Sequence, residues 1–149
     1  MTALPIQLSL LPQRTTLTAS QSDSVNFDVG PQTLVSTCFR HEPPTPVELE
    51  HAIELIENAL MDAGYRPENP GALVTDDTQI RRLPGLEDLG ANLTRDQVES
   101  LFQRLADISL GSPQTRGDLP TDREAAAALL ILRECMHHLG FTSIAIAAR

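Results

Sequence analysis

The fold of this chain is decided by the stretch Thr121–Ala147, TDREAAAALLILRECMHHLGFTSIAIA. No residue from Ala125 to Leu132 is polar, so the stretch predicts a helix that is apolar on every side and must be covered by other elements. Thr121 followed by Glu124 fits a capping box at the start of this helix, and Gly140 suits the left-handed residue that ends one. We therefore expect a buried helix around which the remaining elements pack.

Two short apolar runs predict buried strands. Ile144–Ala147 follows the glycine, and Gly71–Thr75 is bounded by Pro70 and by Asp76-Asp77. Both runs are short, apolar and uninterrupted, as in strands that are covered on both faces. A buried helix combined with buried strands indicates a sheet with helices packed against it.

Before residue 40 the sequence predicts β structure that is mainly antiparallel. Short segments rich in Leu, Ile, Val and Thr alternate with turn residues. The turns are Pro12-Gln13-Arg14, Gln21–Ser24 and Gly30-Pro31-Gln32, and the predicted strands are Ile6–Leu11, Thr15–Ala19, Val25–Val29 and Leu34–Phe39. Pro43-Pro44 cannot continue a ladder, so the strands stop there.

Two amphipathic helices are predicted outside the apolar stretch. The first covers Pro46–Ala63, because Thr45 and Glu48 form a capping box and Gly64 suits the end of a helix. The second begins after Thr94, which has Gln97 three residues later, and reaches Ser109. The predicted loops are Thr78–Asn92, with a helical turn at Ile80–Leu83, and the polar linker Gly111–Pro120.

The order of elements predicts an α/β (or α+β) fold in a single domain covering residues 1–149. Strands at 1–40 form the N-terminal antiparallel part of a mixed sheet, and 45–149 adds helix, strand, helix, helix and strand, giving about three packed helices. Hydrophobic residues make up 41% of the chain and charged residues 21%, a composition that excludes a disordered protein.

Charge and residue usage exclude several classes of function. The 20 acidic and 11 basic residues give a net charge of -9, which repels nucleic acid and anionic membrane surfaces. All 11 basic residues are arginine, so lysine Schiff-base chemistry and a P-loop lysine are excluded. The two cysteines form no framework pattern, and neither a signal peptide nor an apolar run of the roughly 20 residues that span a bilayer is visible. We expect a cytoplasmic protein.

The segment Asp28-Val29-Gly30-Pro31-Gln32-Thr33 is a candidate phosphate site. An acid at a strand end followed by a glycine turn can place a carboxylate and backbone amides beside a phosphate and its Mg²⁺. The segment resembles the Asp-x-Gly-x-x-Thr phosphate loop of the actin-like and sugar-kinase superfamily, which implies ligand contacts from Asp28, Gly30 and Thr33. The alternative is a plain β-hairpin around the Gly-Pro turn, in which Pro31 offers no amide.

From Thr45 onward the chain resembles the C-terminal lobe of exopolyphosphatase and guanosine pentaphosphate phosphatase enzymes. The local likenesses are Thr78–Leu83, Asn92–Val98 and Glu124–Ile146, and the likeness covers about two thirds of the chain. It implies a ribonuclease H-like or actin-like lobe. The chain ends at Arg149 without the family's glycine and arginine motif, and it has no room for the lobe that carries the family's catalytic glutamate and first phosphate loop. We therefore expect no unaided phosphatase activity, and no catalytic residue is assigned.

Asp76-Asp77 and Arg81-Arg82 form a second candidate ligand site. Strand ends are common ligand positions in α/β sheets, and paired carboxylates there can hold Mg²⁺. The arginines would supply the local basic site that an anionic ligand requires. The alternative is a solvated turn in which the acids cap the next segment and the arginines neutralise Glu87 and Asp88.

Cys38 and His41 have a spacing that suits metal ligands. A zinc site needs two more ligands, which Cys135, His137 and His138 could supply only if the fold brought the helix end and the strand end together. The alternative is a buried Cys38 in a strand and a solvent-facing His41 where the strand stops, with His137 and His138 interacting with the dipole of the helix that they end.

Three functions remain compatible with the sequence. The first is a small, non-catalytic regulatory or ligand-binding domain that binds phosphate or another phosphorylated ligand, with Mg²⁺ as a possible cofactor and no resident metal site. Its predicted ligand contacts are Asp28, Gly30, Thr33, Asp76 and Arg81. The second is an interaction or scaffold protein that acts as a homo-oligomer, such as a homodimer. The third is a phosphohydrolase completed by a partner chain.

Overall fold

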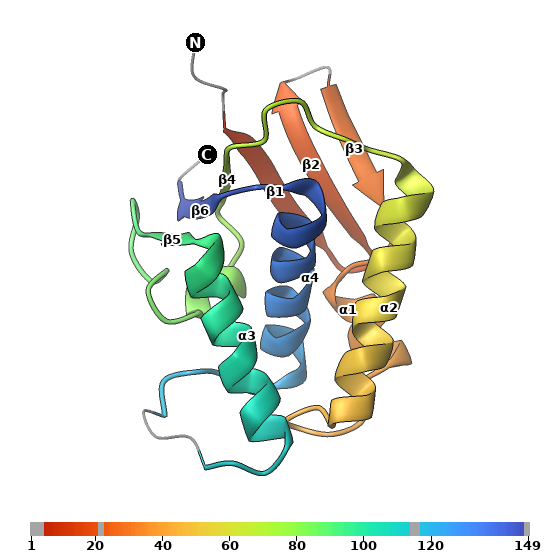
Figure 1. Cartoon of the computed structure of the whole chain (residues 1–149), viewed down its shortest axis with the longest axis vertical. Helices are drawn as coiled ribbons and strands as arrows, with labels where there is room; N and C mark the ends of the chain where they lie inside the picture. Colours follow the sequence, from red (N-terminus) through yellow and green to blue (C-terminus); the bar gives the residue numbers. More distant parts are fainter. Residues whose placement is uncertain (1–4, 21–22, 114–116, 148–149) are drawn as a thin grey trace.

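A six-stranded mixed sheet forms one layer of the molecule (Figure 1). The computed structural model describes residues 5–20, 23–113 and 117–147. The strand order is β3-β2-β1-β4-β6-β5, with β1, β4 and β6 parallel and the remaining pairs antiparallel. The strands are β1 (Ile6–Leu11), β2 (Arg14–Ser20), β3 (Asp23–Phe27), β4 (Ala72–Thr75), β5 (Asn92–Thr94) and β6 (Ser143–Ile146). The mixed sheet with an antiparallel N-terminal part is thus confirmed.

In the described part of the chain, four α-helices cover one face of this sheet (Figure 1). They are α1 (Pro31–Thr37), α2 (Pro46–Ala63), α3 (Arg95–Ser109) and α4 (Arg123–Leu139), and the 3₁₀ turn η1 (Ile80–Arg82) precedes β5. Helix α4 lies in the middle and packs against the other three. No described helix is long and apolar enough to cross a membrane.

The strands alternate between an apolar face and a small polar face. Leu8 and Leu17 lie opposite each other in the register of β1 and β2, and both are buried under the helices. Gln7 and Ser9 turn to the opposite face, where they pair in register with Thr18 and Thr16. The period-2 pattern of the strands therefore separates a core face from a face that no described helix covers.

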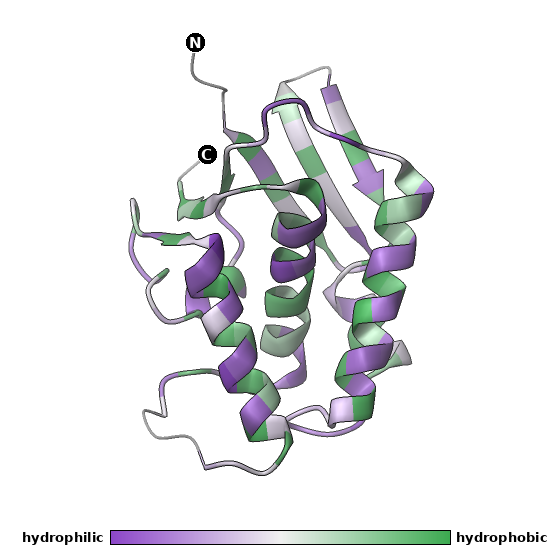
Figure 2. Cartoon of the chain, viewed as in Figure 1, coloured by the Kyte–Doolittle hydropathy of each residue, from purple (hydrophilic) through white to green (hydrophobic). Residues whose placement is uncertain are grey.

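Helix α4 is the buried centre that its sequence predicts. Every residue from Ala125 to Leu132 is at most 1% exposed, and Figure 2 shows the hydrophobic middle of this helix between polar ends. Gly140 ends the helix in the left-handed region, with φ of 82°. The predicted N-cap is wrong: Asp122, not Thr121, accepts the hydrogen bond from the amide of Ala125, at 3.3 Å.

The carboxylate of Asp122, which caps α4, also binds Arg82. The guanidinium of Arg82 donates to both carboxylate oxygens, at 2.6 and 3.0 Å. This hydrogen bonding by Arg82 lowers the pKa of Asp122. The pair fixes the η1 turn to the start of the buried helix.

Replacing Asp122 by alanine is expected to lower the free energy of unfolding by about 1–2 kcal/mol, since a cap and a partly exposed ion pair are lost. Thr121→Ala is the matched control, and urea unfolding should place its loss below about 0.5 kcal/mol. Because the folded-state pKa of Asp122 is lowered, its contribution is present above the usual Asp pKa and is lost as the pH falls through the folded pKa. A Thr121→Ala loss equal to that of Asp122→Ala would contradict this assignment of the cap.

The two amphipathic helices are confirmed with their caps. In α2 the Thr45 hydroxyl accepts from the amide of Glu48 at 3.2 Å, and the Glu48 carboxylate accepts from the amide of Thr45 at 3.1 Å. Gly64 ends α2 with φ of 64°. Thr94 and Gln97 form the same box at the start of α3. The predicted strands Gly71–Thr75 and Ile144–Ala147 and the turn at Ile80–Leu83 are also present, with bounds shifted by one or two residues.

Two predictions about the elements are wrong or incomplete. Leu34–Phe39 is not a strand, because most of it belongs to α1, which has Pro31 in its first turn. The side chains of Leu34, Cys38 and Phe39 are buried in the core. Strand β5 was not predicted: it lies between the end of the predicted loop at Asn92 and the helix cap at Thr94, and it pairs with β6. The predicted turn at Gln21–Ser24 lies partly outside the described residues, and β3 already begins at Asp23.

Candidate functional site

The β1–β2 turn and the start of α1 border an open surface pocket of about 550 Å³. Strands β1 and β3 run in the same direction, so the turn after Leu11 and the segment after Phe27 lie at the same edge of the sheet. This carboxyl edge is the usual position of ligands in α/β sheets. The pocket is lined by Leu11, Gln13, Arg14, Asp28 and Thr33.

Gly30 fixes the start of α1 directly onto this turn. A Cβ atom at Gly30 would lie 2.2 Å from the carbonyl oxygen of Leu11, 2.5 Å from the amide nitrogen of Arg14 and 2.6 Å from the carbonyl oxygen of Pro12. The φ of Gly30 is −136°, so the requirement for glycine is steric rather than conformational. The segment is therefore neither a hairpin turn nor an open loop but a contact between two backbones.

The amides at the start of α1 are already used inside the protein. Those of Gln32 and Thr33 donate to the carbonyl oxygen of Pro12, at 2.8 and 3.3 Å. The amide of Gly30 donates to the hydroxyl of Thr33 at 3.1 Å, and Pro31 has none. A ligand in this pocket would consequently meet side chains rather than a backbone nest.

Arg14 and Asp28 supply the charges of the pocket. Both are exposed, and neither has a hydrogen-bond or ion-pair partner among the residues that the structure describes. Arg14 can donate two hydrogen bonds to a phosphate, and the Asp28 carboxylate can hold a hydrated Mg²⁺. Gln13 and Thr33 add uncharged polar groups at the rim.

The second predicted site does not join the first. Asp76 follows β4, three strand spacings from Asp28 in the sheet order, which is about 14 Å at 4.8 Å a strand. Arg81 lies in η1, where its guanidinium donates to the backbone carbonyl of Glu87 at 3.4 Å. The structure thus groups Asp28, Gly30 and Thr33 and leaves Asp76 and Arg81 elsewhere along the same edge.

Asp77 has a structural role in that second segment. Its carboxylate accepts hydrogen bonds from the amides of Gln79 and Ile80, both at 3.0 Å, and so begins η1. Burial raises the pKa of Asp77 despite these two bonds. The alternative of a capping turn therefore describes Asp77, and Arg82 neutralises Asp122 rather than Glu87 or Asp88.

Among the described residues, the predicted zinc site is not assembled from the cysteines and histidines. Cys38 and Cys135 are both buried and unpaired, and burial raises the pKa of Cys135 to about 12. His41 binds Glu48 at 2.8 Å. The group of metal-ligating side chains found in the described part of the chain contains neither cysteine.

Sequence reasoning missed the basic member of the pocket. Arg14 was expected in the connection before the second strand, but it is the first residue of β2, and its position beside Asp28 depends on the contact between the turn and Gly30. It also missed a cluster of Glu57, Glu134 and His138, which comes from two helices far apart in sequence. Neither grouping leaves a local sequence signal.

Comparison with known proteins identifies solved structures with a similar fold. No family model matches the sequence, and no curated protein matches it. Among solved structures, a Ppx/GppA family member of Aquifex aeolicus superimposes with a TM-score of 0.68 at 15% identity, over 95% of this chain and 51% of that one. The chain has the fold of one lobe of a Ppx/GppA phosphatase.

Two further structures give the same lobe. An exopolyphosphatase of Cytophaga hutchinsonii matches with a TM-score of 0.63 at 11% identity, over 97% of this chain and 53% of that one. An exopolyphosphatase-like protein matches with a TM-score of 0.66 at 10% identity, over 95% and 55%. The chain thus spans about half the length of the Ppx/GppA structures that it matches, and these phosphatases have the actin-like fold. At such identities the likeness concerns the fold alone.

Proposed function

We propose that this protein is a non-catalytic, phosphatase-like lobe that binds a phosphorylated ligand beside the β1–β2 turn. The observation that carries the proposal is the position of Arg14 and Asp28 in one pocket at the carboxyl edge of the sheet, where neither charge has a partner among the described residues. Arg14 binds the phosphate, Asp28 binds it through Mg²⁺, and the Thr33 hydroxyl lies at the rim.

Binding rather than turnover follows from the content of the pocket. Hydrolysis of a phosphate requires a group that orients or activates water in addition to the groups that neutralise the developing charge. Among the described residues, Asp28 is the single carboxylate that lines this pocket, and it is assigned to Mg²⁺. The proposed role is therefore recognition of a phosphorylated small molecule.

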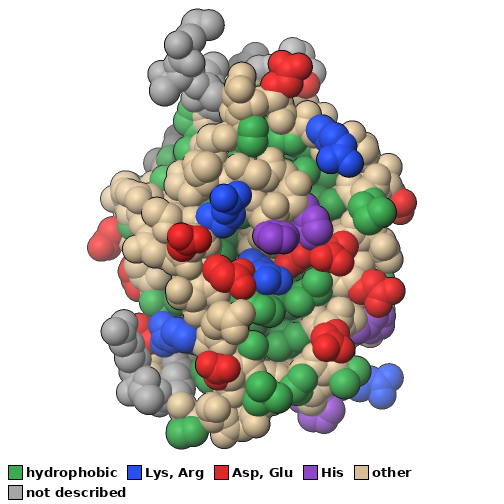
Figure 3. Space-filling model, viewed as in Figure 1, with side chains coloured by type: hydrophobic (Ala, Val, Ile, Leu, Met, Phe, Trp, Pro, Cys, Tyr) green, Lys and Arg blue, Asp and Glu red, His purple; other side chains and the backbone are tan. Residues whose placement is uncertain are grey.

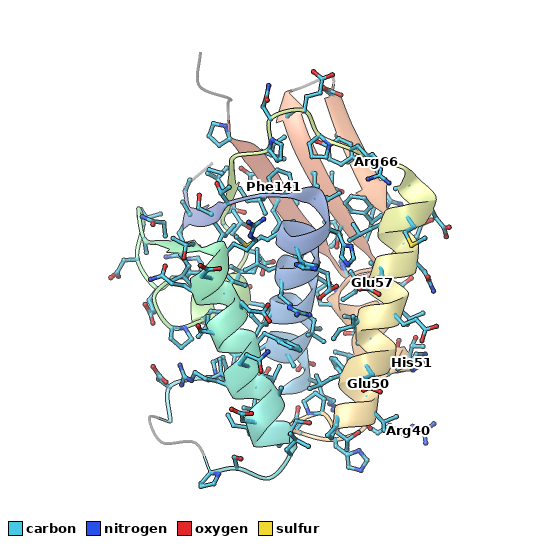
Figure 4. All side chains as sticks on the ribbon, viewed as in Figure 1. Arg40, Glu50, His51, Glu57, Arg66 and Phe141 are labelled. Carbon is cyan, nitrogen blue, oxygen red and sulfur yellow. The ribbon has the colours of Figure 1, made fainter. Side chains whose placement is uncertain are left out.

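The test is calorimetry with tripolyphosphate as the probe, with and without Mg²⁺. Arg14→Ala should weaken binding by roughly 10- to 100-fold, because a charged hydrogen bond contributes about 1.5–3 kcal/mol. Asp28→Ala should abolish the Mg²⁺-dependent part of binding without unfolding the protein. Arg66→Ala is the matched control, since Arg66 lies on the opposite edge of the sheet and is exposed (Figure 4). Equal affinity in the wild type and Arg14→Ala would contradict the proposal.

A second candidate function is association with a protein partner through the open face of the sheet. This face carries small polar side chains, and the side-chain amide nitrogen of Gln7 is buried with no hydrogen-bond partner among the residues that the structure describes. A second copy of the chain would make an interaction or scaffold homo-oligomer, and a different lobe would make a phosphohydrolase completed in trans. Analytical sedimentation at micromolar concentration tests the homo-oligomer by measuring the mass of the protein in solution. A strict monomer would contradict it.

A further inference from the structure

Three metal-ligating side chains meet where α2 and α4 pack against each other. The Nε2 atom of His138 lies 2.9 Å from the carboxylate of Glu57 and 3.2 Å from that of Glu134. One ligand atom of each residue lies within 4.8 Å of the other two. Glu134 and His138 are four residues apart, so they share one face of α4, and α2 brings Glu57 to that face.

The distances suit a small tetrahedral ion. Zinc bonds of about 2.0–2.1 Å to nitrogen and oxygen give ligand-to-ligand distances of about 3.3 Å in a tetrahedron. The two distances from His138 fall within a few tenths of an ångström of that value. An imidazole nitrogen with two carboxylates selects zinc or a similar transition ion over Mg²⁺ or Ca²⁺, which prefer oxygen ligands alone.

Charge at the cluster also favours a divalent cation. Glu57, Glu99 and Glu134 bring three carboxylates, while Arg133 brings one guanidinium, which binds Glu99 at 2.7 Å and Glu134 at 2.6 Å. With His138 neutral, as a metal ligand must be, the local charge is therefore −2. Figure 3 shows these kinds of side chain gathered in the middle of the helix-bearing face.

The cluster combines a buried ligand with two accessible ones. The side chain of Glu134 is 1% exposed, whereas those of Glu57 and His138 are 39% and 36% exposed. Burial raises the pKa of the Glu134 carboxyl in spite of Arg133 and His138. A cation reaching the cluster from solvent would find one ligand fixed in the core and two at the surface, with a fourth position open to water.

We propose that Glu57, Glu134 and His138 bind one zinc ion that joins α2 to α4. Glu134 would bind the ion through the carboxylate oxygen that faces His138, while Arg133 holds its second oxygen. Because the two helices are joined chiefly by packing and by this cluster, the ion would stabilise the folded lobe. The site is independent of the pocket at Arg14, which lies on different elements.

The experiment measures zinc bound to the purified full chain, by calorimetry and by elemental analysis after dialysis. The wild type should bind one equivalent and show a higher melting temperature with zinc. His138→Gln and Glu57→Gln change partly exposed residues and should weaken binding at least 10-fold while the zinc-free protein keeps its circular dichroism. Replacing zinc by Co²⁺ should give the visible absorption of a low-coordinate site, absent in His138→Gln.

Matched controls are His137→Gln, which changes the neighbouring histidine, and Glu54→Gln, one turn earlier on α2. Both should bind zinc like the wild type. Absence of zinc binding would overturn the proposal and leave the cluster as a set of ion pairs only. Binding that survives in His138→Gln but is lost in His41→Gln would overturn it too, by assigning the ion to His41 and Glu48.

Discussion

Gly30→Ala is expected to lower the free energy of unfolding by about 3 kcal/mol or more. The added methyl would meet three backbone atoms of the β1–β2 turn at 2.2 to 2.6 Å, closer than real Cβ contacts. Backbone cannot move aside as a flexible side chain can, so the turn and α1 must separate. Because the total free energy of unfolding of a small domain is only about 5–15 kcal/mol, the variant should unfold at a midpoint urea concentration far below that of the wild type.

Gly71→Ala is the matched control for this prediction. A Cβ atom at Gly71 would have no atom within 4 Å, and its φ is not positive. The variant should unfold within about 0.5 kcal/mol of the wild type. If Gly30→Ala were as stable as Gly71→Ala, the contact between α1 and the turn would not exist as described, and the pocket formed by that contact would be in doubt.

Leu130→Ala is expected to lower the free energy of unfolding by about 3–4 kcal/mol. Leu130 is 0% exposed in the middle of α4, and α1, α2 and α3 all pack around that helix. Truncation removes buried methyl groups and leaves a cavity that helices on several sides cannot all close. Thermal unfolding of the wild type and of Leu130→Ala measures this loss of stability.

Leu110→Ala removes the same atoms from a side chain that is 73% exposed, just after α3. Its expected effect is below about 0.5 kcal/mol. A Leu130→Ala protein that unfolded at the same temperature as Leu110→Ala would show that α4 is not the buried centre of the fold.

Most of the helices could be predicted because their signals are local. Thr45, Glu48 and Gly64 lie within one helix and its caps, and their side chains bind the nearest backbone amides. The same holds for Gly140, and the run Ala125–Leu132 indicates burial by itself. The likeness to one phosphatase lobe rested on the order of these elements, and the structural comparison confirms it.

The errors occur where partners distant in sequence decide the local structure. Gly30 was read as a turn residue, whereas its contact with Leu11 and Arg14 makes it the start of a helix. Strand β5 is three residues long and exists because β6 pairs with it. Asp122 is the cap instead of Thr121, and its carboxylate also binds Arg82, which is 40 residues away in the sequence. No periodic pattern in the sequence predicts any of these contacts.

The candidate site could likewise be predicted only in part. The sequence identified Asp28 and Thr33, and the structure places them in one pocket with Arg14. It could not show that the amides of Gln32 and Thr33 bind Pro12, which changes the proposed contact from backbone to side chains. Nor could it show the separation of Asp76 from Asp28, since strand order is a property of the whole sheet.

Titration of the ¹⁵N-labelled protein with tripolyphosphate and Mg²⁺, followed by amide chemical shifts, tests the proposed function most directly. Binding at the proposed site predicts that the largest shifts occur at Gln13, Arg14 and Asp28 and at the start of α1. The Arg14→Ala protein should lose these shifts while the rest of its spectrum stays unchanged. No shift at millimolar tripolyphosphate, or shifts confined to the segment around Asp76 and Arg81, would contradict a phosphate site beside the β1–β2 turn.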